Sequence, residues 1–470
     1  MIENLKAKLS KKVHFIGLGG IGMSALALLL NKVGVKVQGS DISENYITKT
    51  LTDRSIPYFV GHNKENITDD ISLVVKTSII KEENPEIVAA KEKNIEIITR
   101  AQLLALIMSE KKGITIAGTH GKTSTTAMTS LMLEFGNLDP IVINGGIINY
   151  FKSNYKLGDG EYLVAESDES DASFVILPTF IGAVTNIEPE HLEFYGGDFE
   201  KVKKYFEQYV TQIPQDGLCV MCIDDVESEK IYNKLKATRK NLWSYSVKKD
   251  ADIVAKNIVQ DGSGSTFDAV FRNGKTISQL HTPSYGIHNV SNALVAVAIA
   301  DFLKIDKELI KQALTNFTGV KRRFTKTGEV NGISIIDDYA HHPTEINAVL
   351  NSARQFALDK KVILVLQPHK YSRVQDLFKE FCSCVGGADV VILTDIYSAN
   401  QKPIDGITQD ALLEGIKNSG HKNVIKLMNE DDLAKIVKSV ANKGDIVLCA
   451  GAGTITYMAN KLPNQLKELQ

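Results

Sequence analysis

Short apolar runs alternate with longer segments of helical periodicity along the chain, in three successive series. The first series contains a β-rich run at residues 12–16, the glycine-rich stretch GLGGIG, an apolar segment at 23–30 and the run VKVQGSD. This order predicts a strand, a tight turn, a helix and a second strand. Further runs at 73–75 and 95–99 extend the predicted sheet to about Arg100, and AQLLALIMSEKKG predicts a helix that leads to a boundary near Lys111.

The second series begins at Ile114 with a strand, a glycine loop and the helical segment TTAMTSLMLEF. Its other strand candidates are residues 141–143, 162–165, 181–186 and 218–222. The region 252–281 alternates more finely, with DGSG and RNGK as turn signals, so we expect a small antiparallel excursion there. The stretch HNVSNALVAVAIADFL is typical of one buried helix.

The third series follows the stretch FTGVKRRF. Its strand candidates, separated by helical segments, are residues 333–336, 362–366, 390–393, 424–427 and 446–449. Alternation of this kind is typical of doubly wound parallel sheets. We therefore predict an α/β fold of three domains: a Rossmann-like domain at 1–110, a central domain around the second glycine loop at 111–319, and a doubly wound α/β domain at 320–470.

Composition and charge exclude several classes of protein. With 43% hydrophobic residues, 23% charged residues and a formal net charge of -2, the chain has no bulk attraction to nucleic acid or to an anionic membrane. The five cysteines lack the spacing of a disulfide framework or a zinc site, so we expect reduced thiols in the core. Glycines within the first apolar run argue against a secretory signal, and no segment reaches 18 apolar residues, so we expect a cytoplasmic protein.

The first glycine loop, GLGGIG, matches G-x-G-x-x-G after a strand and before a helix. Asp41, at the end of the next strand, lies about where an acid that binds a ribose would lie. Glycine lets the backbone approach a diphosphate, and the helix N-terminus offers free N–H groups. The motif leaves open whether the diphosphate belongs to NAD, FAD or a nucleotide sugar, or whether the turn binds no ligand.

The second glycine loop, AGTHGKTSTT, is shorter than G-x-x-x-x-G-K-[ST], because Ile116 stands where the first glycine would be. Gly118, Gly121, Lys122 and Thr123 still supply what a phosphate cradle needs: backbone N–H groups at a helix start, a lysine and a hydroxyl for Mg²⁺. The alternative, a run of Thr and Ser that caps a helix, leaves the Gly-Lys-Thr core unexplained. We therefore predict a site for ATP.

Two acidic clusters follow later strands of the same series. AESDESDASF presents Glu166, Asp168, Glu169 and Asp171, and NIEPEHLEFYGGDF adds two glutamates and His191. Ligands of open α/β sheets gather at the carboxyl ends of the strands, and a Mg²⁺ bound to a nucleotide takes one hydroxyl and one or two carboxylates. Each cluster alone fits a solvated acidic loop equally well, but together they favour a metal site.

In combination these motifs resemble the Mur ligase family nearly from end to end. They are, in order, HFIGLGGIGMSALA, GTHGKTSTT, AESDESDASF, NIEPEHLEFYGGDF, YGIHNVSNALVA, GVKRRF, DDYAHHPTE, QPHKYSR, DIYSA and GAGTI. The family uses the short form A-G-T-x-G-K-T of the phosphate-binding loop. The resemblance implies an ATP-dependent ligase that joins L-alanine to the lactyl carboxylate of UDP-N-acetylmuramate, with three domains that bind UDP-sugar, ATP and amino acid.

The resemblance also implies roles for individual residues. Assigned to the UDP-sugar are Gly17, Gly19, Gly20, Ile21, Gly22, Ser40 and Asp41. Assigned to ATP are Gly118, Thr119, His120, Gly121, Lys122, Thr123, Ser124, His288, Asn289, Asn292, Arg323 and Asp338. Assigned to Mg²⁺ are Thr123, Glu166 and, for a second ion, His191. Assigned to the amino acid are Tyr339, His341, His369, Lys370 and Arg373, and the catalytic residues are Lys122, His191, His341 and Arg373.

The chain departs from the family pattern in two respects, and the identity of the proton acceptor is open. Lys370 stands where the family commonly has arginine, so a planar bidentate contact is replaced by a point charge. No lysine downstream of His191 aligns with the carbamylated lysine of several relatives, so none is assigned. His341 or His369 would take the proton from the ammonium group of L-alanine.

Three other functions stay open on the sequence. A ligase that joins a preformed tripeptide to the same sugar shares most of these motifs. An NAD-dependent oxidoreductase would use GLGGIG and Asp41 but leaves Gly121-Lys122-Thr123 without a role. A nucleotide-switch or scaffold protein would use the P-loop to control partners. For the ligase we expect small-molecule substrates as partners, no nucleic acid, no membrane insertion, and a monomer or homodimer.

Overall fold

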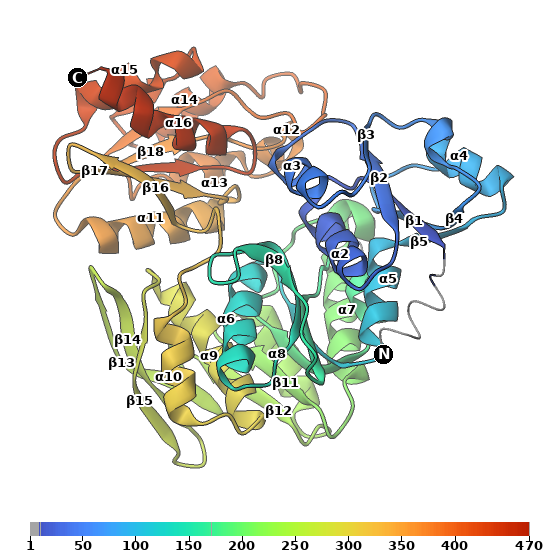
Figure 1. Cartoon of the computed structure of the whole chain (residues 1–470). Helices are drawn as coiled ribbons and strands as arrows, with labels where there is room; N and C mark the ends of the chain where they lie inside the picture. Colours follow the sequence, from blue (N-terminus) through green and yellow to red (C-terminus); the bar gives the residue numbers. More distant parts are fainter. Residues whose placement is uncertain (1–8, 10, 171, 470) are drawn as a thin grey trace. The chain divides into compact units, whose positions relative to one another are not determined.

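The computed structural model describes residue 9 and residues 11–170 and 172–469, and in this part of the chain the strands form three sheets (Figure 1). Each sheet corresponds to one of the three series of apolar runs. The chain divides into two compact units. The first contains residues up to Lys256, Asp268–Leu280 and Ser291–Phe317, and the second contains Asn257–Phe267, His281–Val290 and residues from Thr318 onward.

The N-terminal sheet has five parallel strands in the order β3-β2-β1-β4-β5. They are β1 (Lys12–Ile16), β2 (Val37–Asp41), β3 (Tyr58–Val60), β4 (Ile71–Lys76) and β5 (Glu96–Thr99), with the helices α2 (Ile21–Lys32), α3 (Tyr46–Asp53), α4 (Pro85–Glu92) and α5 (Arg100–Met108). The order reverses between β1 and β4. Ligands of doubly wound sheets bind outside the carboxyl ends of the strands at such a reversal, and the first glycine loop follows β1 there.

The central sheet has ten strands in the order β15-β14-β13-β12-β11-β10-β6-β9-β7-β8. They are β6 (Lys112–Ala117), β7 (Ile141–Ile148), β8 (Ser153–Lys156), β9 (Tyr162–Glu166), β10 (Thr179–Val184), β11 (Leu218–Cys222), β12 (Leu242–Ser246), β13 (Ile253–Asp261), β14 (Gly264–Phe271) and β15 (Thr276–Thr282). The finely alternating region is therefore not separate from the sheet, because its three strands continue the sheet beyond β12. Strand β8 pairs antiparallel with β7 at the other edge.

The helices of the central region are α6 (Lys122–Phe135), α7 (Phe199–Gln212), α8 (Val226–Leu235), α9 (Ile287–Phe302) and α10 (Lys307–Thr315). Helices α6 and α10 pack side by side (Figure 1). Helix α2 of the N-terminal sheet packs on β7 and β8, and its leucines share one core with Ile143 and Leu163. Asn154 Nδ2 also donates a hydrogen bond of 2.7 Å to the carbonyl oxygen of Ile21. The first glycine loop is thus held against the central sheet.

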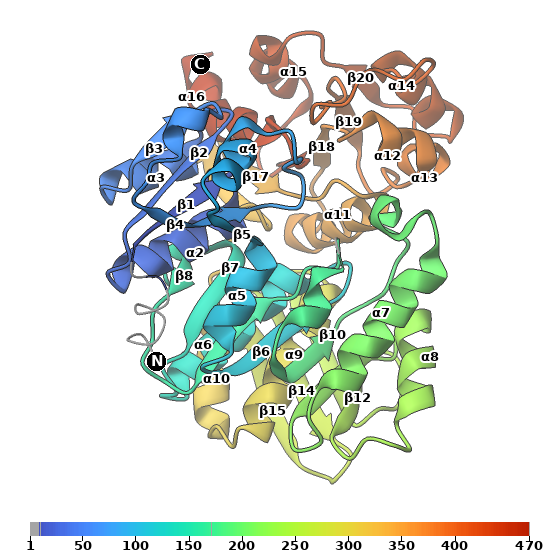
Figure 2. The same cartoon turned by 90° about the vertical axis from the view of Figure 1, so that its right-hand side faces the viewer.

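The C-terminal sheet has six strands in the order β16-β17-β21-β18-β19-β20. They are β16 (Thr325–Val330), β17 (Ile333–Asp338), β18 (Val362–Leu366), β19 (Val390–Leu393), β20 (Val424–Lys426) and β21 (Ile446–Ala450). All neighbours are parallel except β16 and β17, which form an antiparallel pair at one edge. The helices are α11 (Pro343–Ala357), α12 (Tyr371–Asp376), α13 (Phe378–Ser383), α14 (Gln409–Asn418), α15 (Leu433–Val440) and α16 (Ile455–Glu468), and α13 and α14 pack together (Figure 2).

The apolar strands of this third sheet are buried on both faces. Along β18, Val362, Leu364 and Leu366 belong to one core, whereas Ile363 and Val365 belong to another. Successive side chains of a strand point to opposite faces, so an unbroken apolar run requires helices on both sides. The predicted α/β fold class is confirmed. The expected reduced cysteines are confirmed as well: all five are free, and Cys384 is the one that is not fully buried. Among the described residues, no helix is long and apolar enough to cross a membrane.

Candidate active site

The loop between β6 and α6 has the backbone of a phosphate cradle. Gly118 and Gly121 have φ angles of +127° and +86°, a region that favours glycine. A Cβ atom at Gly118 would also lie 2.1 Å from Thr185 Oγ1, so no other residue fits there without a shift of its surroundings. Helix α6 begins at Lys122, and the N–H groups of a first helical turn have no partner within the helix. These groups can bind an anion.

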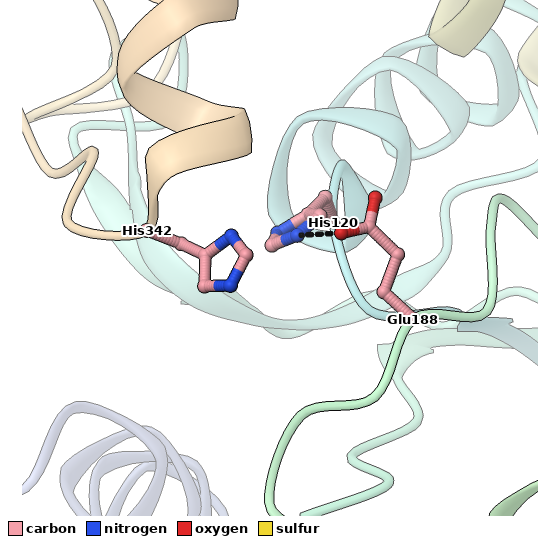
Figure 3. A group of neighbouring side chains, drawn as sticks. All are labelled: His120, Glu188 and His342. Carbon is pink, nitrogen blue, oxygen red and sulfur yellow. Dashed lines mark ion pairs between the residues drawn. The ribbon is translucent and has the colours of Figure 1, made fainter. Parts of the chain in front are cut away.

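The segment that follows β10 holds this loop in place. The backbone N–H of Thr119 donates to the Asn186 carbonyl oxygen at 3.0 Å, and that of His120 donates to Asn186 Oδ1 at 2.8 Å. Thr185 Oγ1 donates to the His120 carbonyl oxygen at 2.6 Å. Glu188 donates its backbone N–H to Thr119 Oγ1 at 2.8 Å, and its carboxylate lies 3.5 Å from His120 Nε2 (Figure 3). No role was expected for Thr185 or Asn186, because the predicted strand at 181–186 includes both, whereas β10 ends at Val184.

The predicted metal ligands Thr123 and Glu166 meet at the start of α6. Thr123 Oγ1 donates a hydrogen bond of 3.2 Å to Glu166 Oε2, and the Gly145 backbone N–H donates to Glu166 Oε1. A Cβ atom at Gly145 would lie 2.6 Å from Glu166 Oε1, so this glycine lets the carboxylate approach the backbone. A hydroxyl and a carboxylate oxygen at this separation are hard oxygen donors of the kind that Mg²⁺ takes. The sequence did not single out Gly145.

His191 lies in the second acidic cluster in a strained backbone conformation. Its φ angle is +56°, which is uncommon for a residue other than glycine. Burial lowers the pKa of the imidazole, although Glu190 and Asp168 oppose this effect. Metals bind the neutral imidazole, so the environment favours the form that a metal ligand needs. Asp171, the last acid of the first cluster, lies outside the described residues.

The other residues assigned to ATP lie in both units. Asn292, on α9, comes close to the phosphate loop: its Oδ1 would lie 2.7 Å from a Cβ atom at Gly121. Ser124 is half-buried in the first turn of α6. His288 and Asn289 belong to the second unit, where Asn289 Nδ2 donates to the Tyr285 carbonyl oxygen at 2.8 Å.

The first glycine loop is stabilised by the end of β2. The N–H groups of Gly17 and Leu18 both donate to the Ser40 carbonyl oxygen at 2.9 Å. Asp41 Oδ2 accepts a hydrogen bond of 2.8 Å from the Gly19 N–H, and its Oδ1 accepts one from the next residue. The Ser40 hydroxyl is buried and donates to Glu86 Oε2 at 2.6 Å. The Asp41 side chain and the Ser40 carbonyl oxygen therefore support the loop in this structure, and a direct contact of either residue with a ligand stays a prediction.

Arg100 connects the first glycine loop to the acidic loop after β9. Its Nη1 would lie 3.3 Å from a Cβ atom at Gly22, in the first turn of α2. Its Nη2 lies 3.3 Å from Asp168 Oδ2. Arg100 therefore lies between the helix that follows the first glycine loop and the acidic loop that follows β9.

Four of the five residues assigned to the amino acid come together in the second unit. The rings of Tyr339 and His341 have centroids 5.2 Å apart, and those of His341 and His369 are 5.6 Å apart. Arg373 Nη1 lies 3.2 Å from His369 Nδ1. The Tyr397 ring stacks on His369 at 5.5 Å, so Tyr397 joins the cluster. The sequence contained this tyrosine in the motif DIYSA but gave it no role.

Lys370, the fifth of these residues, has a φ angle of +70° and directly precedes α12. Its backbone N–H donates to the Tyr397 carbonyl oxygen at 2.8 Å. A residue other than glycine with positive φ is held there by its surroundings, and such strain is common at functional sites. The strand pairing between His369 and Tyr397 provides this restraint.

Asp338 and Arg323, both assigned to ATP, lie near each other beside the same cluster. Asp338 Oδ2 accepts a hydrogen bond of 2.7 Å from the Phe324 N–H, and Oδ1 accepts one of 2.7 Å from the Ala340 N–H. Burial raises the pKa of Asp338 to about 6, although the Arg323 guanidinium and these hydrogen bonds oppose it. The guanidinium of Arg323 lies over the Tyr339 ring at 5.4 Å. Arg323 and Asp338 thus lie beside the predicted amino-acid residues.

Three α/β sheets in series, with a phosphate-binding loop that faces an acidic loop in the second, define a multidomain α/β protein of the P-loop class. Three family models match the chain: the Mur ligase family catalytic domain at residues 12–112, the Mur ligase middle domain at 116–300, and the Mur ligase glutamate ligase domain at 322–453. The chain belongs to the Mur ligase family.

Curated relatives and solved structures agree with this assignment. The chain is 46% identical over 462 residues to UDP-N-acetylmuramate–L-alanine ligase of Bradyrhizobium diazoefficiens, covering 97% of this chain and 98% of the relative. It is 44% identical to the enzyme of the same name in Rhodospirillum centenum, covering 97% and 95%. The crystal structure of UDP-N-acetylmuramate-alanine ligase from Thermotoga maritima is similar with a TM-score of 0.85 at 30% identity, covering 98% and 100%. A murein peptide ligase from Psychrobacter arcticus shares the fold, with a TM-score of 0.71 at 24% identity, covering 97% and 98%.

Proposed function

We propose that the protein is an ATP-dependent ligase that joins L-alanine to the lactyl carboxylate of UDP-N-acetylmuramate in the synthesis of peptidoglycan precursors. The observation that carries this proposal is the identity of 44% or more, over 97% of the chain, to relatives named for that activity. The geometry of Lys122, Thr123 and Glu166 supports it from the chemical side. The domains at 1–110, 111–319 and 320–470 would bind UDP-sugar, ATP and L-alanine respectively.

The phosphate-binding loop would hold the triphosphate of ATP. Its backbone N–H groups and the N-terminus of α6 attract the phosphates, and the Lys122 ammonium adds a full positive charge. Positive charge is required because the lactyl carboxylate and the γ-phosphate are both anions and repel each other. The remaining residues proposed for ATP are Thr119, His120, Ser124, His288, Asn289, Asn292, Arg323 and Asp338.

Thr123 and Glu166 would hold a Mg²⁺ ion, and His191 a second one. The fit rests on the donors themselves, a hydroxyl and a carboxylate oxygen 3.2 Å apart and an imidazole that burial keeps neutral. When bound, Mg²⁺ would neutralise charge on the transferred phosphoryl group. Gly145 would keep the Glu166 carboxylate in position through its backbone N–H.

Two steps account for the chemistry without a nucleophile from the enzyme. A carboxylate oxygen of the sugar attacks the γ-phosphorus, ADP leaves, and an acyl phosphate forms. The neutral amine of L-alanine then attacks the acyl carbon, and inorganic phosphate leaves with the electrons of the broken C–O bond. Arg373 would bind the carboxylate of L-alanine, together with Lys370, and His341 would accept the proton that the ammonium group loses.

The test is phosphate release by the purified protein with ATP, Mg²⁺, UDP-N-acetylmuramate and L-alanine. We expect release only when all four are present, together with a product heavier by one alanine residue. Release of phosphate at the same rate without the sugar nucleotide would contradict the proposal. A direct competition between L-alanine and the tripeptide separates the proposed activity from tripeptide ligation. Preferred use of the tripeptide would show that the neighbouring activity is the correct one.

A further inference from the structure

Lys122 has no hydrogen-bond donor left for a phosphate in this structure. Its Nζ donates to the carbonyl oxygens of Gly118 and Thr119, the latter at 3.0 Å. The same Nζ lies 3.0 Å from Glu169 Oε1 and 2.7 Å from Oε2. An ammonium group has three N–H donors, and two carbonyls and one carboxylate use all of them. ATP cannot be bound by Lys122 until one of these partners is released.

Glu169 is the only charged one of the three partners, and it is buried. The residue is 3% exposed, and its backbone carbonyl accepts hydrogen bonds from the Ala172 N–H and the Tyr195 hydroxyl. These hydrogen bonds hold the backbone of Glu169 in place. Burial raises the pKa of Glu169 to about 7, although the Lys122 ammonium beside it lowers it, so an unpaired negative charge is disfavoured at this place.

The neighbouring acid Asp168 has a different environment. Its side chain is 42% exposed, and its nearest charged partner is Arg100. Asp168 raises the pKa of Lys122 through its charge, and among the described residues no hydrogen bond joins the two side chains. The two acids thus provide a matched pair, in which one carboxylate contacts Lys122 and the other only adds negative charge nearby.

We propose that Glu169 is a resident counter-ion of Lys122 that ATP must displace, so that it is a positioning residue that sets the affinity for ATP. Without nucleotide the lysine is held by the buried carboxylate. When the triphosphate enters, its oxygens replace the Glu169 carboxylate as the ionic partner, and the ammonium group moves by rotation about its side-chain bonds. This inference rests on the proposed binding of ATP at the loop, and it adds a residue that the proposed mechanism does not use.

The test uses calorimetry to measure the binding of an ATP analogue in the presence of Mg²⁺. The analogue has an imido group between the β and γ phosphorus atoms and is not hydrolysed. For Glu169→Gln we expect a Kd about tenfold lower than that of the wild type, or about 1.4 kcal/mol, because the competing charge is gone. Glu169→Ala serves as a second variant in case the first does not fold. Asp168→Asn is the matched control and is expected to change Kd less than about threefold. In turnover, Glu169→Gln should lower KM for ATP in proportion, whereas Glu169→Asp should restore KM to about that of the wild type.

An unchanged or weaker affinity in Glu169→Gln and Glu169→Ala would overturn the inference, because it would mean that the carboxylate supports the lysine instead of competing for it. An equal increase in affinity for the analogue in Asp168→Asn would overturn it too, since the removal of any nearby negative charge would then have the same effect. Failure of the proposed function has a separate signature. In that case the wild type would not bind the analogue, or Lys122→Met would bind it as tightly as the wild type.

Discussion

The hydroxyl of Thr123, in the first turn of α6, donates a hydrogen bond of 3.2 Å to the carboxylate of Glu166, at the end of β9. The two residues lie 43 positions apart in the sequence and meet because β6 and β9 are neighbouring parallel strands. The carboxyl ends of both strands, and the loops that follow, therefore lie at one edge of the sheet.

Thr123→Val should remove the proposed metal hydroxyl while keeping the shape of the side chain. We expect kcat/KM to fall about 10²-fold to 10³-fold, the range for loss of one group that stabilises charge in the transition state. Thr123→Ser keeps the hydroxyl and should retain most of the activity. Initial rates of phosphate release over a range of Mg²⁺ concentrations provide the measurement. Activity of Thr123→Val within threefold of the wild type would show that the hydroxyl is not a ligand.

Arg373→Lys should raise KM for L-alanine about tenfold or more and leave KM for ATP unchanged. The planar guanidinium can hold a carboxylate by two parallel hydrogen bonds, whereas an ammonium group acts as a point charge. Lys370→Arg is the reciprocal control, because it restores the residue that the family commonly has, and its KM should equal or fall below that of the wild type. Steady-state kinetics at saturating ATP and sugar nucleotide decide this point. A parallel rise of both KM values in Arg373→Lys would indicate a structural defect instead.

The two histidines of the second unit should differ in their effect on the pH profile. Burial, His341 and the nearby cations lower the pKa of His369 to about 3, so this imidazole is neutral but is a very weak base. A general base works best with a pKa near the operating pH, so His369 is poorly suited to this role and His341 is the proposed proton acceptor. We expect His341→Gln to lower kcat and to remove the acid limb of its pH profile, while His369→Gln keeps the limb. Loss of the limb in His369→Gln alone would reverse the assignment.

Asp338 should make the stability of the protein depend on pH. Its pKa in the folded state, about 6, lies above the ordinary 3.8, because burial outweighs the effects of Arg323 and of the two backbone hydrogen bonds, while Glu345 adds to the increase. The folded state therefore binds the proton more tightly. This stabilisation is fully present below about pH 4 and is lost as the pH rises through 6, by about 3 kcal/mol for a shift of about 2 units.

The measurement is the difference in unfolding free energy between wild type and Asp338→Asn, by denaturant titration at several values between pH 4 and 7. Asparagine does not titrate, so the difference should change by about 3 kcal/mol across this range in the stated direction, apart from a constant offset for the lost carboxylate. A difference that is constant with pH would show that Asp338 titrates normally.

Much of the fold follows from the sequence because apolar runs that are buried on both sides are easy to detect. The strands β1, β9, β11, β18, β19 and β21 agree closely with runs that consist mostly of apolar residues. The edge strands β3, β8 and β16 were not predicted, because they are short or polar and their existence depends on a neighbouring strand that supplies hydrogen bonds. The placement of β13, β14 and β15 as a continuation of the central sheet depends on pairing that no local pattern contains.

The candidate site was predictable only as far as its motifs extend. Lys122, Thr123 and Glu166 stand in recognisable motifs, and the structure brings them together. Gly145, Asn186 and Tyr397 act through a backbone N–H, a loop contact and a stacked ring, and these functions have no characteristic sequence signal. Glu169 appeared in the sequence as one of four neighbouring acids, and only its burial against Lys122 distinguishes it from Asp168.

The most direct test of the proposed reaction follows one oxygen atom. UDP-N-acetylmuramate labelled with ¹⁸O in its lactyl carboxylate is incubated with the protein, ATP, Mg²⁺ and L-alanine, and the inorganic phosphate is analysed by mass spectrometry. An acyl phosphate predicts that each phosphate released carries one ¹⁸O atom from the carboxylate. Phosphate that contains no ¹⁸O would contradict the account, because the sugar acid would then never have been phosphorylated.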